Sequence, residues 1–141
     1  MRRLASLPVV VALPEGHALA KQTTLKLADL RGVPFIGARD ADLPGFNRWV
    51  TGLCRRAKFR PQFVEDADSL GHALSLLVAE NAVTFLPALT NKVLAPGVVC
   101  RPLDEPAARW DLHVAWQRGR MTEAVRALVG GMGRAQRAGK D

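Results

Sequence analysis

The sequence contains no tyrosine, and phenylalanine and tryptophan together make up only 6% of its residues. So few aromatic side chains leave no evident stacking platform for the bases of a nucleic acid. Long hydrophobic runs are also missing: none approaches the roughly 18 residues that a membrane-spanning helix needs. The start, Met1-Arg2-Arg3 and then apolar residues, differs from a secretory signal, because Pro8 and Pro14 interrupt it and no small-x-small cleavage site follows. We therefore expect a cytoplasmic protein without membrane contact.

Cysteine is scarce as well, because Cys54 and Cys100 are the only two in the chain. Neither belongs to a CxxC pair or to a Cys/His spacing typical of zinc, and both fall within apolar patterns. We expect two buried, reduced thiols. The sequence predicts no metal site and no cofactor.

No combination of residues typical of catalysis stands out. The histidines are far apart in sequence, in a turn, a helix and a strand: His17, His72 and His113. Ser69 and Ser75 lack the GxSxG pattern of a nucleophile turn. Residues 133–140 have five residues between two glycines, where a phosphate-binding loop has four, and no Ser or Thr follows the lysine. We predict that the protein is not an enzyme.

The net charge of +7 and the pI of about 10.4 raise the question of nucleic-acid binding. The basic residues are spread along the chain, with clusters only at residues 55–60 and after Arg134. This distribution favours a solvated basic surface over a face that reads DNA, which stays open as an alternative.

Strands and helices alternate between residues 33 and 86. Short apolar runs predict strands at residues 33–36, 62–65 and 82–86. Between them, one helix opens at Pro44-Gly45 with an apolar stripe of helical spacing: Phe46, Trp49, Val50, Leu53, Cys54 and Ala57. A second helix covers residues 70–78, and Asn81 ends it in a left-handed conformation. This βαβαβ pattern predicts parallel strands with right-handed crossovers.

Further elements flank the βαβαβ unit. The apolar run at residues 8–12 predicts a strand, which Pro14 and Gly16 end in a turn. After Pro87 we expect a short helix at residues 89–94, strands at 98–101 and 112–116, and an amphipathic helix from Met121 to about Gly130 with a frayed basic tail.

Ligands of open parallel sheets bind beyond the carboxyl ends of the strands. That rule selects three loops here, with the candidate binding residues Gly37, Ala38, Arg39, Asp66, Ala67, Asp68, Pro87 and Ala88. The guanidinium of Arg39 suits a carboxylate or phosphate, and helix starts favour anions. Two simpler readings remain open: Arg39 pairs with Asp40 or Asp42 on the surface, and Asp66 or Asp68 caps the following helix.

The ordered segments resemble one known family over roughly residues 7–130. PVVVALPEGHALA, LADLRGVPFIG, FRPQFVEDADS, LLVAENAVTFLP, PGVVCRPL and LHVAW are similar in order and spacing to the effector-binding domain of LysR-type transcriptional regulators. Three positions depart from the family pattern. Ala18 stands where Pro usually follows His, Lys58 stands where Gly usually precedes Phe, and a Gly-x-Gly is replaced around Glu80-Asn81-Ala82.

The resemblance implies an α/β fold like that of type 2 periplasmic binding proteins, with one complete βαβαβ lobe and the returning part of a second lobe. Residues 1–14 would be a crossover strand from lobe I, residues 15–86 lobe II, and residues 87–141 the return to lobe I. The hinge residues would be Pro14, Gly16, Leu86 and Pro87. His17 then becomes a structural turn residue.

The resemblance also implies the function. A small acidic metabolite (a carboxylate) would bind between the lobes of a homodimer or higher oligomer and control transcription. DNA would be bound only through a winged helix-turn-helix that has no counterpart in this sequence. The early part of lobe I has none either, so we expect the chain to dimerise through its open strands or to be part of a longer protein. A fragment of a solute-binding protein with the same fold is the alternative.

Overall fold

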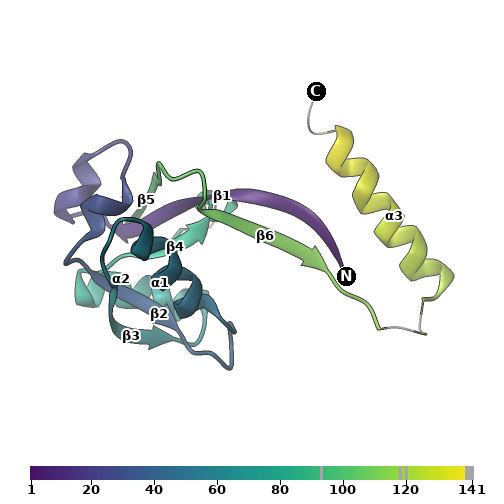
Figure 1. The fold of residues 1–141 in the computed structure, drawn as a ribbon, viewed down its shortest axis with the longest axis horizontal. Coiled ribbons are helices and arrows are strands. Elements are labelled where there is room, and N and C mark those ends of the chain that lie inside the picture. Colours follow the sequence, from purple (N-terminus) through teal and green to yellow (C-terminus); the bar gives the residue numbers. More distant parts are fainter. Residues whose placement is uncertain (93, 118, 120, 139–141) are drawn as a thin grey trace. The chain divides into compact units, whose positions relative to one another are not determined.

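The computed structural model describes residues 1–92, 94–117, 119 and 121–138 (Figure 1). The chain forms two compact units, Pro8–Arg109 and Met1–Leu7 with Trp110–Asp141, which are described separately. The elements in chain order are β1 (Arg2–Pro14), two short 3-10 helices (Ala18–Lys21 and Leu27–Leu30), β2 (Pro34–Ala38), α1 (Phe46–Arg56), β3 (Gln62–Ala67), α2 (Leu70–Glu80), β4 (Thr84–Pro87), a third 3-10 helix (Ala88–Lys92), β5 (Val98–Pro102), β6 (Arg109–Val114) and α3 (Glu123–Ala138).

The larger unit contains the predicted βαβαβ pattern. β2 and β3 pair in parallel from Pro34–Gln62 to Ala38–Ala67. Val83, just before β4, forms a parallel bridge with Phe35, and β4 then pairs antiparallel with β1, as Ala12 opposite Thr84 shows. The predicted fold class, a mixed α/β fold with parallel neighbours, is therefore confirmed.

The helices of the larger unit form where the apolar spacing predicts them. In α1 the residues Phe46, Val50, Leu53 and Cys54 are buried. Aromatic rings meet edge to face beneath this helix, with the centroids of Phe35 and Phe85 5.5 Å apart and those of Trp49 and Phe85 6.0 Å apart. The apolar stripe thus packs α1 onto the strands, and burial of these side chains is the main stabilising term of the unit.

Helix ends show one confirmed prediction and one correction. Asn81 ends α2 in a left-handed conformation, with φ of 48°, as predicted. The start of α2 is capped by Ser69, whose hydroxyl accepts a hydrogen bond from the His72 N–H, and not by Asp66 or Asp68. Asp66 lies within β3, so its backbone is already committed to the sheet when the helix begins.

β5 extends the sheet on the other side of β1. It pairs antiparallel with β1 from Val10–Pro102 to Pro14–Val98, within the larger unit. β1 therefore lies between β4 and β5, which pairs both of its edges. The side chains of Val9 to Leu13 are almost completely buried, and Val10 and Ala12 belong to a buried cluster with Ile36 and Leu77.

The smaller unit combines the first residues of β1, most of β6 and α3. β6 pairs with β1, and Arg3 forms an ion pair with Asp111 at 3.6 Å. α3 runs to Ala138, beyond the predicted end near Gly130, and its Leu128 is 60% exposed. The final residues of the expected basic tail, 139–141, lie outside the described residues.

Candidate functional site

The carboxyl ends of β2 and β3 bring two of the three predicted loops together. Because the strands are parallel and in register from Gly37–Asp66 to Ala38–Ala67, both chains leave the sheet at the same edge. The Arg39 N–H continues the pairing by donating to the Ala67 carbonyl at 2.9 Å. We call this group, Gly37–Arg39 with Asp66–Asp68, the strand-end site.

Asn47 holds the two halves of the strand-end site in place. Its Oδ1 accepts a hydrogen bond from the Ala38 N–H at 2.9 Å, and its Nδ2 donates to Asp66 Oδ1 at 2.9 Å. Gly37 lies directly beside this pair, and a side chain there would overlap the Asp66 carboxylate and the Asn47 amide. The first turn of α1, β2 and β3 are thus fixed to one another through one amide.

Charged side chains surround Arg39. Its Nε lies 2.7 Å from Asp42 Oδ2, and its Nη2 lies 3.8 Å from Asp68 Oδ2. The reading of Arg39 as a surface arginine paired with Asp42 is confirmed, while Asp40 instead accepts a hydrogen bond from the Gly45 N–H. The guanidinium is half exposed, so a ligand can reach it, but an incoming anion has to compete with two carboxylates.

Asp68 is the most connected carboxylate of the strand-end site. The Ser69 hydroxyl donates to its Oδ1 at 3.0 Å, and His72 Nδ1 lies 3.1 Å from the same oxygen. The Ser69 hydrogen bond, followed by the charges of His72 and Arg39, lowers the pKa of Asp68 below its usual value. Asp68 is therefore ionised and keeps Arg39 oriented towards β3.

The third predicted loop contributes differently. Leu86 and Ala67 belong to one buried cluster, and Ala88 packs against it. Pro87 pairs with Val9 in the sheet, and its carbonyl accepts a hydrogen bond from the buried Thr90 hydroxyl at 2.7 Å. This loop supports the sheet edge, and Ala88 is its link to the same core as the strand-end site.

The expected hinge residues lie inside the larger unit. Pro14 pairs with Val98, Leu86 pairs with Val10, and Gly16 follows in the turn. The boundary between the two compact units falls at residues 7–8 and 109–110, and the hinge residues stay a prediction. A proline that ends a sheet ladder does not have to end a folded unit, because here the following turn hydrogen-bonds back, from the Glu15 N–H to the Gly97 carbonyl.

His17 has a structural contact. It is only 8% exposed, and its Nδ1 accepts a hydrogen bond from the Leu19 N–H at 3.1 Å, which caps the first 3-10 helix. Burial lowers its pKa, so the ring is neutral. This geometry agrees with a turn residue.

The cysteines are free thiols, one buried and one half-buried. Burial raises the pKa of Cys54 to about 12 and that of Cys100 to about 11, so neither is a ready nucleophile. Within the described residues, no three His, Cys, Asp or Glu side chains are grouped closely enough to hold a metal ion. Nor is any described helix long and apolar enough to cross a membrane.

Sequence reasoning missed Asn47 and Ser69. Asn47 is one residue into α1, where a short polar side chain can reach back to the preceding strand, and this position was the available signal. Ser69 directly precedes the apolar helix pattern and is a better N-cap candidate by position than either aspartate.

Comparison with known proteins first defines the class. The fold matches full-length CbnR, a LysR family regulator in complex with its target DNA, with a TM-score of 0.83 and 21% identity over 99% of this chain and 48% of that chain. The BenM effector-binding domain with benzoate gives a TM-score of 0.80 and 18% identity over 97% of this chain and 63% of that one. The chain thus has the type 2 periplasmic-binding-protein-like fold of these domains.

The family follows from the sequence. The model of the LysR substrate binding domain matches residues 1–136, and the chain belongs to this family. Similar proteins include the HTH-type transcriptional regulators AlsR of Bacillus subtilis (strain 168), 25% identical over 88% of this chain, and BudR of Raoultella terrigena, 26% identical over 92%. The chain spans 41% and 44% of the length of these two transcriptional regulators.

Proposed function

We propose that this chain is the sensory part of a LysR-type transcriptional regulator, and that it binds a small metabolite at the strand-end site. Binding does no chemistry. The ligand changes which conformations are populated by binding some of them more tightly than others. The observation that carries this proposal is the convergence of Gly37–Arg39 and Asp66–Asp68 at one sheet edge, in a chain of this family.

The effector is an anion, most simply a carboxylate. Its charge takes the place of Asp42 or Asp68 beside the Arg39 guanidinium, where both carboxylates are more than a third exposed. The backbone groups of Gly37 and Ala38 lie at the same end of the sheet as Arg39. Ala88 packs against the buried cluster below this end, which contains Ala67. Two similar effector-binding domains are in complex with small carboxylates: the BenM domain with benzoate and the QuiR domain with shikimate.

A thermal-shift titration tests the proposal, with benzoate, shikimate and a series of other small carboxylates as probes. A carboxylate present at 100 times its Kd stabilises the chain by about 2.7 kcal/mol. Arg39→Ala is expected to remove this stabilisation. Arg60→Ala, at the opposite end of β3, is expected to leave it unchanged. Stabilisation by small amines in place of carboxylates, or an unchanged response in Arg39→Ala, would contradict the proposal.

We further propose that Pro8–Arg109 is one lobe and that Met1–Leu7 with Trp110–Asp141 belongs to the other, so that the hinge lies at residues 7–8 and 109–110. The protein acts in the cytoplasm as a homodimer, and DNA is bound by a helix-turn-helix part of the regulator. Size-exclusion chromatography with light scattering tests the oligomer, and a stable monomer at all concentrations would argue against it. A role as a solute-binding protein has less support, because the relatives are transcriptional regulators.

A further inference from the structure

The turn after α1 contains a lysine in a conformation that favours glycine. Lys58 has φ of 60°, in the left-handed region, and its side chain is exposed. Its N–H donates to the Arg55 carbonyl at 2.9 Å, and the Phe59 N–H donates to the Cys54 carbonyl at 3.4 Å, which is the Schellman pattern of a helix end. Residues with a Cβ are strained at this position, so a lysine here points to a use for its charge.

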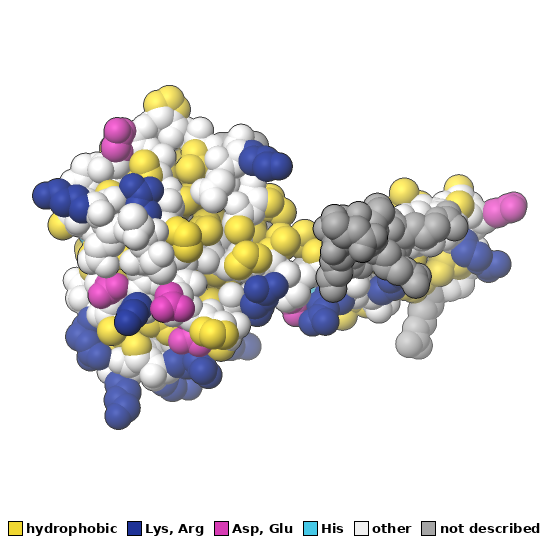
Figure 2. Space-filling view, turned by 90° about the horizontal axis from the view of Figure 1, so that it is seen from above, with side chains coloured by type: hydrophobic (Ala, Val, Ile, Leu, Met, Phe, Trp, Pro, Cys, Tyr) yellow, Lys and Arg dark blue, Asp and Glu magenta, His cyan; other side chains and the backbone are white. Residues whose placement is uncertain are grey.

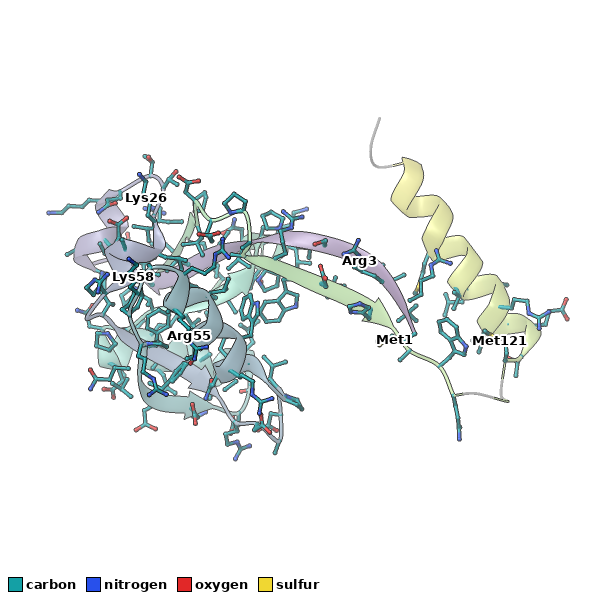
Figure 3. All side chains as sticks on the ribbon, in the orientation of Figure 1. Met1, Arg3, Lys26, Arg55, Lys58 and Met121 are labelled. Atoms are coloured by element: carbon teal, nitrogen blue, oxygen red, sulfur yellow. The ribbon has the colours of Figure 1, made fainter. Side chains whose placement is uncertain are left out.

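Lys58 lies in a segment without negative charge. Residues 43–64 contain five cationic side chains and no Asp or Glu: Arg48, Arg55, Arg56, Lys58 and Arg60. All five are exposed, and only Arg56 has an ion-pair partner among the described residues, Glu105 at 3.3 Å. Figure 2 shows Lys and Arg side chains on several sides of the larger unit, with Asp and Glu side chains among them, and Figure 3 labels Arg55 on α1 and Lys58 just beyond its end.

The helix end does not need these cations for its own stability. Arg31, from the turn before β2, donates to the Ala57 carbonyl at 2.7 Å and to the Lys58 carbonyl at 3.3 Å. Its guanidinium also lies over the Phe59 ring, 5.6 Å from the centroid. Since Arg31 already satisfies the last carbonyls and offsets the helix dipole, the side chains of Arg55, Lys58 and Arg60 remain available to a partner.

We propose that Arg55, Lys58 and Arg60, here called the basic surface, bind the phosphate backbone of duplex DNA without regard to sequence. The proposal rests on the proposed function, because a regulator attached to DNA elsewhere keeps a duplex close to this domain. Arg55 lies in the last turn of α1, and Lys58 and Arg60 follow it in the turn and loop before β3, so three exposed cations fall within six consecutive residues. Several neighbouring cations without acidic partners suit a polyanion better than one small anion. The segment offers no exposed aromatic ring for bases to stack on, which favours backbone contact over reading of bases.

Fluorescence anisotropy of the 141-residue chain with a labelled duplex of scrambled sequence, measured over a range of salt concentrations, tests the surface. In the variant Arg55→Glu/Lys58→Glu/Arg60→Glu, the affinity at low salt is expected to fall at least about tenfold, and the slope of log K against log salt to shrink by about 2.7, at 0.9 per lost phosphate contact. The matched control is Arg2→Glu/Lys21→Glu/Lys92→Glu, which makes the same change of net charge at exposed positions outside the basic surface. The affinity of this control variant for the duplex at low salt is expected to fall by less than about threefold.

Lys58→Gly separates binding from folding. Because glycine relieves the left-handed strain, this variant is expected to melt a few degrees higher than the wild type and yet bind the duplex more weakly, with a slope smaller by about 0.9. Lys58→Arg keeps the charge and is expected to keep the affinity.

Several results would overturn the proposal. If the two triple variants lost duplex affinity equally, net charge alone would explain the loss and the basic surface would have no special role. Unchanged binding in Lys58→Gly would leave the lysine without this role. Tighter binding of a polyglutamate peptide than of the duplex would make the surface a site for an acidic protein. The carboxylate titration described above is unaffected by these outcomes, so the failure of one proposal is distinguishable from the failure of the other.

Discussion

Gly37→Ala tests the central geometric claim, that one crowded contact sets the strand-end site. A Cβ at this position would overlap Asp66 Oδ1 and lie 2.5 Å from Asn47 Oδ1, where carbon and oxygen need more than 3 Å. The Asn47 side chain therefore has to turn away and give up both of its hydrogen bonds. The chain is fixed here by strand pairing on the side of β3, so the backbone has little room to move instead.

The cost can be worked out from these contacts. The bond from the Ala38 N–H is worth about 1 kcal/mol, and the bond to the Asp66 carboxylate about 1.5 kcal/mol after allowance for its exposure. Replacing glycine by alanine restricts the unfolded chain and returns about 0.4–1 kcal/mol. The free energy of unfolding is thus expected to fall by about 2 kcal/mol, which corresponds to a drop of about 5–12 °C in Tm.

Urea unfolding followed by circular dichroism measures this change. Gly52→Ala is the matched control, because Gly52 lies inside α1 with no heavy atom within 4 Å of the added Cβ, and alanine is expected to stabilise the helix by about 0.5–1 kcal/mol. In the double variant Gly37→Ala/Asn47→Ala, the two costs should overlap by about 1–2 kcal/mol because they break the same bonds. Strict additivity, or a Gly37→Ala variant as stable as the wild type, would refute the reasoning.

Three further predictions follow from single contacts. Ser69→Ala removes the N-cap of α2 and should lower the free energy of unfolding by about 1 kcal/mol, while Ser69→Asp should retain it, as chemical denaturation will show. Burial lowers the pKa of His17 in the folded chain, so on acidification the unfolded chain binds a proton at this histidine first. The free energy of unfolding should therefore fall as the pH drops through about 6.5. His17→Asn should flatten this part of the curve of stability against pH, and an unchanged curve would contradict the prediction. At pH 7 iodoacetamide should modify Cys54 and Cys100 far more slowly than a free thiol, since burial raises the pKa of both, and mass spectrometry measures the rates.

Much of the larger unit could be predicted from local pattern. The apolar spacing from Phe46 onward predicted α1, and the position of Asn81 after the second apolar stripe predicted the left-handed end of α2. The strand-end rule also brought Arg39 and Asp68 to the same edge, where they do form an ion pair. These features depend on residues close in sequence, or on a parallel arrangement that short βα connections impose.

Asn47 and β5 could not be predicted in the same way. Asn47 acquires its role only because β3 brings Asp66 within hydrogen-bond distance of the first turn of α1. β5 could pair with any open strand edge, and its apolar alternation is the same for each of them. The Gly37 contact also depends on these distant partners, so no local rule distinguishes this glycine from Gly52.

By itself, the sequence determined the βαβαβ unit, the apolar faces of α1 and α2, and the family. Tertiary structure alone decided that β1 lies between β4 and β5, that the two units divide at residues 7–8 and 109–110, and that Arg39 is held between Asp42 and Asp68. The physical reason is that hydrophobic periodicity and capping act over a few residues. Strand pairing and ion pairs are instead chosen among many distant partners, and only the folded chain makes that choice.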